Sequence, residues 1–152
     1  MSADFDARLY EHYCFACGRQ NPLGLHMRFE RDGDGVLARY TPRPEDCGFP
    51  GVFHGGVLVT LLDEAMAWAM YAGARTLGVT ATMETRYRRA ARLDEQLTVR
   101  ARVVRARGRR IIVEATLDAP GGERVAEAKA LFLRLPPEQD AEVRSAIGWT
   151  AD

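Results

Sequence analysis

The 152-residue sequence has little of the features that mark secreted or membrane-spanning proteins. Its cysteines, Cys14, Cys17 and Cys47, are odd in number and include one Cys-x-x-Cys pair, which argues against a secreted disulfide framework. No apolar run approaches the length of a membrane span, and the polar first residues lack the apolar stretch of a signal peptide. These absences predict a cytoplasmic protein with no membrane partner.

Net charge is also absent, because 21 basic side chains balance 21 acidic ones. The whole chain is therefore not expected to bind nucleic acid. Lysine is nearly missing too, and Lys129 is the only one. Positive charge is thus almost entirely guanidinium, and it crowds residues 86–110. Guanidinium groups bind phosphate through paired hydrogen bonds, so this segment can serve a phosphorylated ligand.

What the chain does contain fits one domain with a hydrophobic core. Hydrophobic residues make up 47% and charged residues 28%, the balance of an ordinary globular protein. We expect a single domain over residues 1–152, with an irregular segment at 1–24 and a tail at 137–152.

Hydrophobic periodicity predicts an α+β fold. Apolar residues recur at helical spacing from His54 to about Arg75, and most remaining positions there are apolar or small, as in a buried helix. Alternating patterns predict strands at Leu25–Glu30, Val36–Tyr40, Val79–Arg89, Glu95–Arg107, Arg109–Asp118 and Glu123–Leu135. Short connections imply consecutive hairpins and an antiparallel sheet of about six strands wrapped around the helix. An exposed edge strand of that sheet would favour pairing with a second copy.

The helix start is the first candidate for chemistry. His54-Gly55-Gly56 opens the helix with no Ser, Thr, Asp or Asn cap directly before Gly55. Bare N–H groups at a helix start, together with the helix dipole, favour developing negative charge, which is what an oxyanion hole requires. The same pattern also suits a close-packed turn in which glycine only provides space.

Two adjacent acids, Asp63 and Glu64, lie inside the apolar helix. Successive residues point about 100° apart, so at least one carboxylate should face the interior or a subunit interface. Burying an unpartnered carboxylate is costly, and such groups often have a function. We assign the functional interpretation to Asp63 and an ion pair with an arginine to Glu64.

The spacing of Gly55 and Asp63 bears on assembly. Eight residues of helix cover roughly 12 Å, too far for one carbonyl group to contact both ends. If Gly55 holds an oxyanion and Asp63 drives the attack, the two residues must come from different subunits of a dimer.

These residues resemble a known family. Val52–Gly56 (VFHGG) followed by Leu61–Ala65 (LLDEA) is similar to the motif of hotdog-fold acyl-CoA thioesterases of the PaaI type, in the 4-hydroxybenzoyl-CoA thioesterase superfamily. Gly78–Met83 with Tyr87–Ala90 resembles the strand that follows the helix in that family, and Cys14–Leu25 resembles one bacterial branch.

The resemblance implies hydrolysis of aryl or medium-chain acyl-CoA thioesters, with coenzyme A only as part of the substrate and no cofactor. Gly55 would polarise the carbonyl, and Asp63 would act as general base or nucleophile. Thr80 would lie near Asp63 on the following strand and orient the water, and His54 would shape the turn rather than act as base. Gly48 stands where relatives often have an assisting amide. The substrate-binding residues expected are Gly56, Glu64, Thr82, Arg88 and Arg89. A homodimer, further paired into a tetramer, is the implied assembly.

Alternatives remain at this point. A hotdog hydratase or dehydratase would need a loop histidine that does not precede Phe49 here. A non-catalytic acyl-CoA-binding or sensor protein would not need Asp63, and a purely structural oligomer leaves the buried acid unexplained. Cys14 and Cys17 are a possible half of a metal site with Cys47, His12 or His26, but a second ligand pair is not evident, so no metal is expected.

Overall fold

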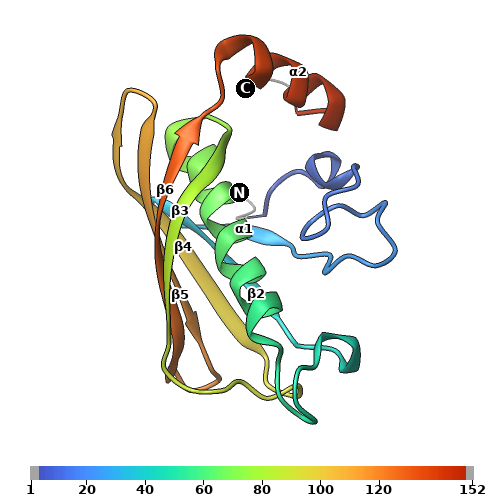
Figure 1. The fold of residues 1–152 in the computed structure, drawn as a ribbon. Coiled ribbons are helices and arrows are strands. Elements are labelled where there is room, and N and C mark those ends of the chain that lie inside the picture. Colours follow the sequence, from blue (N-terminus) through green and yellow to red (C-terminus); the bar gives the residue numbers. More distant parts are fainter. Residues whose placement is uncertain (1–3, 150–152) are drawn as a thin grey trace.

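The computed structural model describes residues 4–149 and shows the predicted α+β architecture, a sheet against one long helix. The strands are β1 (Phe29–Asp32), β2 (Gly35–Tyr40), β3 (Gly78–Tyr87), β4 (Leu97–Arg107), β5 (Arg110–Asp118) and β6 (Arg124–Arg134). The helices are α1 (Gly55–Ala74) and α2 (Pro137–Ile147), with short 3-10 turns at Ala7–Tyr10 and Pro44–Asp46. The sheet lies on one side of α1, and the N-terminal segment and α2 lie on the other (Figure 1).

All strand pairs are antiparallel, as predicted, in the order β1-β2-β4-β5-β6-β3. The prediction of consecutive hairpins is wrong for β3, which pairs with β6 at the sheet edge, while β2 lies beside β4. An alternating pattern identifies a strand but carries no information about its neighbours. Strand β3 is therefore a long edge strand of the sheet, and its residues Val79 and Tyr87 are more than half exposed.

Strand β1 is later and shorter than the predicted Leu25–Glu30. The N–H of Leu25 donates instead to the carbonyl of Phe15 at 2.8 Å, inside the irregular N-terminal segment. The apolar residues 25 and 27 are buried by that segment rather than by a ladder. The alternation of apolar residues that predicted a strand from Leu25 therefore reflects burial and not strand pairing.

Helix α1 is apolar nearly all round because it is covered on both faces. Leu61, Leu62 and Ala65 are completely buried in the core. The helix ends at Ala74, and the next residue, Arg75, has a φ of 53°, the left-handed conformation common at helix ends. Among the described residues, α1 is long and apolar enough to cross a membrane by length and composition, contrary to the expectation from the sequence, but half of that window is buried within the fold.

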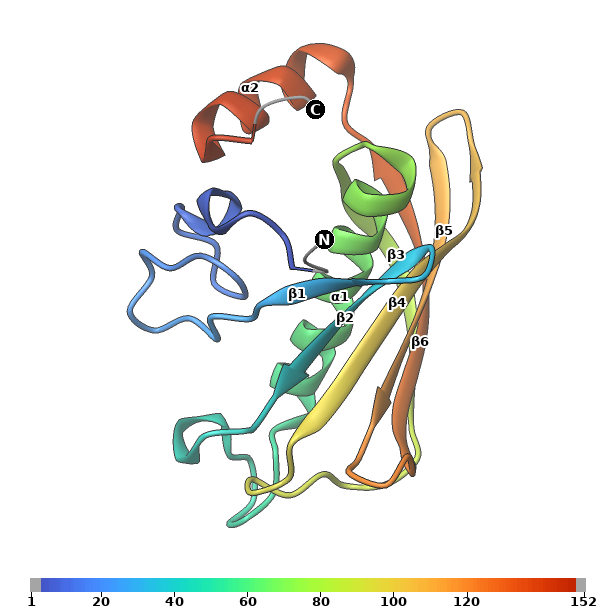
Figure 2. The same cartoon turned by 180° about the vertical axis from the view of Figure 1, so that it is seen from behind.

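Figure 2 shows the N-terminal segment on the side of α1 away from the sheet, and an aromatic cluster attaches this segment to the helix. The ring of Trp68 stacks on Tyr10 and Phe29 with centroids 5.1 and 5.0 Å apart. Phe5 and Trp149 meet the same indole edge-on, at 5.0 and 5.2 Å. Aromatic pairs in these geometries contribute beyond their buried area, so the segment is held firmly despite its irregular backbone.

The expected weakly amphipathic tail contains the helix α2 (Pro137–Ile147), which sequence reasoning did not assign. Proline at its first position and Gly148 in the left-handed conformation just after its end are helix boundary signals that were present in the sequence. The helix returns the chain to the N-terminal segment, where Trp149 Nε1 donates to the carbonyl of Leu9 at 2.7 Å.

Candidate active site

His54 caps helix α1. Its Nδ1 accepts the backbone N–H of Gly56 at 2.9 Å, so a histidine does what a Ser or Asp usually does at this position. Sequence reasoning, which noted no usual capping residue, missed this contact. The structure thus places His54 in the turn-shaping position. The ring is committed to the backbone two residues ahead.

The loop before the helix is fixed by a buried carboxylate, Asp46. Its carbonyl accepts the His54 N–H at 2.8 Å, and its side chain accepts Tyr40 OH at 2.5 Å and the Arg43 guanidinium at 2.8 Å. Burial raises the pKa of Asp46, but the hydrogen bonds from Arg43 and Tyr40 outweigh burial and hold the pKa below its usual range. The ionised form therefore holds the loop that positions the helix start.

Gly55 is the glycine that presents an N–H group. Within residues 4–149 this N–H donates to no acceptor, whereas the N–H of Gly56 is taken by His54. Tyr87 OH donates to the Gly55 carbonyl at 2.9 Å, and its ring lies 3.4 Å from where a Gly55 Cβ would be. A donor at the helix start is thus available from Gly55, and the expected contact from Gly56 N–H is already used.

Asp63 and Thr80 form the second half of the candidate site. Thr80 Oγ1 donates to Asp63 Oδ1 at 2.6 Å, the length of a hydrogen bond to a charged acceptor. Asp63 is half-buried, and both residues lie beside the exposed edge strand β3. The predicted proximity of the two side chains is therefore present in the structure.

A bulge in β3 brings Thr80 to this position. Thr80 pairs with Phe132 and Thr82 with Leu131, so Ala81 is an extra residue in the ladder. After the bulge, odd-numbered residues face α1, as the bond from Tyr87 to Gly55 shows. Without the bulge, regular alternation would point the side chain of Ala81 toward the helix. With the bulge, the side chain of Thr80 points there instead. Thr82, expected to bind substrate, is exposed on the opposite face.

Glu64 faces the N-terminal segment and is not ion-paired in the described part of the chain, so the predicted pair with an arginine is wrong. Its Oε1 accepts Trp68 Nε1 at 3.2 Å and faces Cys14 Sγ at 3.7 Å. Burial, together with the nearby Cys14, raises the pKa of Glu64 to about 7. Sequence reasoning missed this because it had no means of placing Cys14, fifty residues away, against the helix.

Cys14 and Cys17 lie beside that carboxylate. The hydrogen bond from Cys17 lowers the pKa of the Cys14 thiol to about 5, and the same bond together with burial raises that of Cys17. Cys47, one of the suggested partners, is exposed in the loop before α1 and lies outside this cluster. His12 is the histidine that lies beside it, with Nε2 4.0 Å from Cys17 Sγ.

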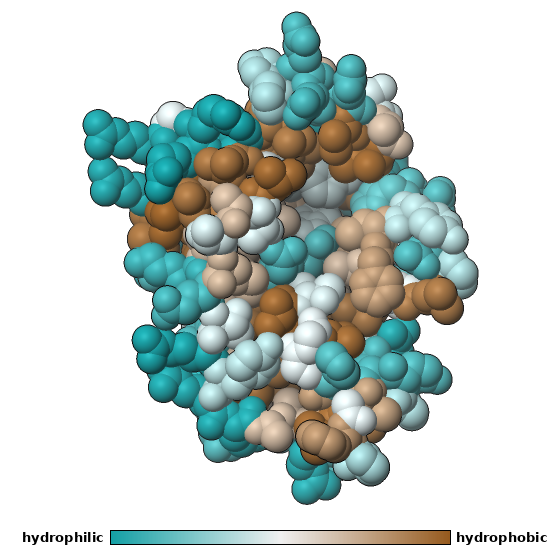
Figure 3. Space-filling view, viewed as in Figure 1, coloured by the Kyte–Doolittle hydropathy of each residue, from teal (hydrophilic) through white to brown (hydrophobic). Residues whose placement is uncertain are grey.

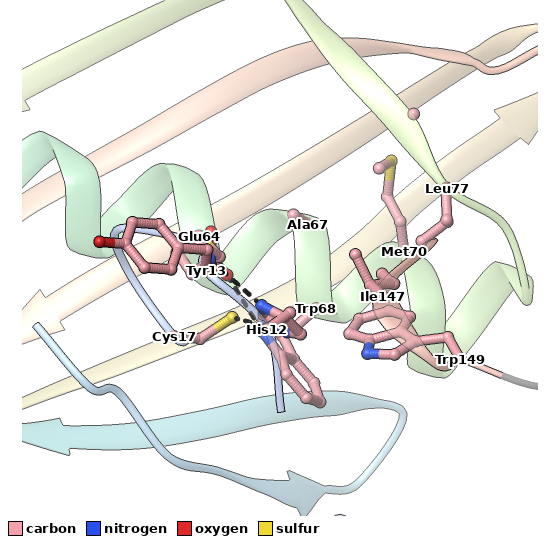
Figure 4. A pocket seen from close by; sticks show the side chains of 12 residues that line it. His12, Tyr13, Cys17, Glu64, Ala67, Trp68, Met70, Leu77, Ile147 and Trp149 are labelled. Carbon is pink, nitrogen blue, oxygen red and sulfur yellow. Dashed lines mark hydrogen bonds between the residues drawn. The ribbon is translucent and has the colours of Figure 1, made fainter. Parts of the chain in front are cut away.

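A mainly apolar cavity of about 350 Å³ opens from these side chains, between α1, the N-terminal segment and the end of α2 (Figure 4). Trp68, Met70, Leu77, Ile147 and Trp149 form its apolar walls. Figure 3 shows apolar surface gathered beneath the C-terminal segment in this part of the molecule. Glu64 lines the cavity, so α1 presents its two acids to different surroundings.

The arginines expected to meet substrate are engaged within the chain. Arg88 pairs with Glu127, and Arg89 pairs with Glu95 at 2.8 Å and with Glu123 at 3.1 Å. A phosphate would have to displace these carboxylates. Among the described residues, four arginines of the β4–β5 hairpin have no acidic partner, namely Arg105, Arg107, Arg109 and Arg110. They belong to the arginine-rich segment at residues 86–110, but the sequence alone did not distinguish the arginines that form ion pairs from those that do not.

Comparison with known proteins relates the sequence of this chain to a thioesterase family. Residues 50–126 match the family described as the thioesterase superfamily. The acyl-coenzyme A thioesterase THEM4 of Bos taurus is 23% identical over 141 residues, which are 90% of this chain and 57% of the relative. The chain spans about half the length of the curated relatives it matches.

Solved structures share the architecture. A crystal structure of a thioesterase superfamily protein is 28% identical with a TM-score of 0.73, covering 80% of this chain and 60% of that one. A hypothetical thioesterase from Streptococcus pneumoniae with coenzyme A is 23% identical with a TM-score of 0.67, over 72% and 85%. The PaaI protein of E. coli is 18% identical with a TM-score of 0.68, over 74% and 81%. The predicted hotdog fold is thereby confirmed.

Proposed function

Because the chain belongs to the thioesterase superfamily, we propose that it hydrolyses acyl-CoA thioesters with aryl or medium-chain acyl groups, in a site that two copies build together. The observation that carries the proposal is the division of the chemistry along α1. An available N–H at Gly55 and a carboxylate at Asp63 lie on one continuous helix, roughly 12 Å apart. The name of the bovine relative and the coenzyme A bound by the Streptococcus protein support the substrate class.

A second copy supplies the missing half. The ten-residue strand β3 lies beside Asp63, and its outer edge pairs with no other strand among residues 4–149. Pairing of two such edges would bring Thr80 and Asp63 of each copy toward the other copy. Two-fold symmetry would create two equivalent sites. Each site would take Gly55 from one subunit and Asp63 from the other. A further pairing into a tetramer remains a prediction.

The chemistry then follows from the two groups. The thioester carbonyl oxygen accepts the Gly55 N–H, and the helix dipole adds to the stabilisation of negative charge on that oxygen. The Asp63 carboxylate removes a proton from water as the water attacks the carbonyl carbon. The tetrahedral intermediate collapses by breaking the carbon–sulfur bond, and the thiolate of coenzyme A takes up the proton. Thr80 holds the carboxylate through its 2.6 Å hydrogen bond.

A nucleophilic route uses the same residues. Asp63 would attack the carbonyl to form a mixed anhydride and release the thiol, and water would then cleave the anhydride. Single-turnover hydrolysis in ¹⁸O-labelled water distinguishes the routes. The general-base route places label only in the acid product, whereas cleavage of the anhydride at the aspartyl carbon places label in Asp63.

The first test is thiol release from a panel of aryl and medium-chain acyl-CoAs, with wild type and Asp63→Asn compared. We expect turnover by wild type and its loss in the variant, with binding of acyl-CoA retained. Asp34→Asn, in the turn between β1 and β2, is a matched control that should retain activity. Turnover that survives Asp63→Asn refutes the mechanism. Binding without turnover in wild type supports a sensor protein instead.

The shared site has its own test. Mixing Asp63→Asn chains with Gly55→Ala chains forms heterodimers in which one of the two sites has both wild-type residues. Random exchange should restore about a quarter of wild-type activity to two inactive proteins. A site built within one chain would stay inactive in every mixture, and that result contradicts the two-subunit arrangement.

A further inference from the structure

A cluster of metal-binding side chains lies on the opposite side of α1 from the sheet. One ligand atom each from Cys14, Cys17 and Glu64 lies within 4.8 Å of the others. We propose that these three residues bind a divalent transition metal of the zinc class, which joins the N-terminal segment to α1 at the mouth of the apolar cavity. The proposal does not depend on the thioesterase assignment.

The turn Cys14–Gly18 is shaped to bring both sulfur atoms to one side. Gly18 N–H donates to the Cys14 carbonyl at 2.8 Å, which closes the turn. A Cβ on Gly18 would lie 2.4 Å from both Cys14 N and the His12 carbonyl, so only glycine fits. A Cys-x-x-Cys turn of this kind supplies two thiolate ligands from adjacent positions. Cys17 is buried and Cys14 is partly buried.

Glu64 provides a ligand that a simple dithiol would not need. Its Oε1 accepts from Trp68 Nε1 at 3.2 Å and from Cys14 Sγ at 3.7 Å, and the Cys17 thiol also hydrogen-bonds to the carboxylate. The cavity beside it is lined by neither lysine nor arginine. A carboxylate next to two sulfurs in apolar surroundings is costly without a cation, and a bound divalent metal supplies one.

His12 is placed to support the cluster rather than to join it. Its Nδ1 accepts the backbone N–H of Cys14 at 3.2 Å, so in the neutral ring the proton is on Nε2. That nitrogen lies 4.0 Å from Cys17 Sγ and donates toward the sulfur (Figure 4). A donor to a ligating thiolate orients it and tunes its charge. His12 therefore acts on the metal through Cys17.

The donor set selects the kind of metal. Two thiolates with one carboxylate suit Zn²⁺ and exclude Mg²⁺ and Ca²⁺, which prefer oxygen ligands. In tetrahedral geometry, zinc–sulfur bonds of about 2.3 Å place the ligand atoms roughly 3.8 Å apart. Side-chain rotations that move these atoms by about 1 Å would therefore complete the site. Three protein ligands leave a fourth position, which faces the cavity of about 350 Å³. A water or a ligand held in that cavity would complete the coordination.

Cobalt titration of the full chain tests the site directly. Reduced protein, stripped with a chelator, is titrated with Co²⁺ as a spectroscopic substitute for Zn²⁺. We expect one equivalent per chain, a thiolate-to-cobalt charge-transfer band, and displacement of Co²⁺ by Zn²⁺. Cys14→Ser and Cys17→Ser should lose the band or weaken binding by at least about 100-fold, and His12→Ala should weaken it by about 10- to 100-fold. Glu64→Gln should weaken binding while keeping part of the band.

Cys47→Ser is the matched control, because Cys47 is an exposed cysteine outside the cluster, and it should bind like wild type. Circular dichroism verifies that each variant is folded, and the wild-type titration decides the question even where a variant does not fold. Absence of the charge-transfer band in reduced wild type overturns the proposal. So does a band that persists in Cys14→Ser with the affinity of wild type. Formation of a Cys14–Cys17 disulfide by oxidised glutathione, in a protein that binds no Co²⁺ when reduced, would overturn it in favour of a redox pair.

Discussion

Replacing each of the two glycines at the start of α1 with alanine separates chemistry from structure. A Cβ on Gly55 would lie 3.4 to 3.7 Å from atoms of the Tyr87 ring, which is ordinary van der Waals contact. A Cβ on Gly56 would lie 3.0 Å from His54 Cε1 and 3.1 Å from Nδ1, so the capping ring must move. The two substitutions are chemically identical and adjacent, yet they should have opposite consequences.

Gly55→Ala should leave the free energy of unfolding within about 1 kcal/mol of wild type, because alanine fits and favours helix. Its methyl group stands where a thioester must approach the N–H, so kcat/KM should fall about 10²- to 10³-fold, equivalent to about 2.7–4 kcal/mol of transition-state stabilisation. Gly56→Ala should lose the 2.9 Å bond to His54 and about 1 kcal/mol of stability, with the smaller loss of activity.

Denaturant unfolding and steady-state thiol release on the same preparations measure both effects. We expect the two variants to rank in opposite order for stability and for activity, with Gly55→Ala the more stable and the less active of the two. If Gly55→Ala retains kcat/KM within about threefold of wild type, the Gly55 N–H is not the oxyanion donor. If Gly56→Ala is the less active of the two, the capping histidine matters to catalysis more than the available N–H does.

Three other perturbations have defined outcomes. Thr80→Val removes the donor to Asp63 and should lower kcat about 10- to 100-fold with the fold intact, whereas Thr80→Ser should retain kcat. Steady-state kinetics and circular dichroism measure the two properties, and an unchanged kcat in Thr80→Val would contradict a role for the Thr80–Asp63 hydrogen bond. Asp46→Asn should cost about 2 kcal/mol at pH 7. Because the pKa of Asp46 is lowered in the fold, this contribution is present above the unfolded pKa of about 3.9 and disappears as pH falls through the folded pKa. The free energies of unfolding in urea should therefore converge for the two proteins in acid. A difference that does not change with pH would contradict the ion pair. Val79→Lys on the exposed edge of β3 should shift a dimer toward monomer in light scattering and lower activity with it, and an unchanged mass would argue against β3 as the interface.

The sequence predicted the parts of the site that depend on local order. Helical spacing over residues 54–75 and the adjacent acids at its centre identified α1 and its two carboxylates, because periodicity reports burial directly. The glycine pair identified the helix start for the same local reason. The proximity of Thr80 to Asp63 came from family resemblance, and no pattern in the chain shows the bulge at Ala81 that turns Thr80 toward the helix.

The chain by itself thus determined an antiparallel sheet, one buried helix and a divided pair of reactive groups on that helix. Tertiary structure alone decided which strand became the edge, which glycine N–H stayed available and what surrounds Glu64. The strand at the edge depends on β3 pairing with β6 across the intervening residues 88–123. The surroundings of Glu64 depend on an irregular segment fifty residues away that packs through aromatic contacts. Contacts between such distant segments are set by packing and leave no local periodicity for a sequence pattern to report.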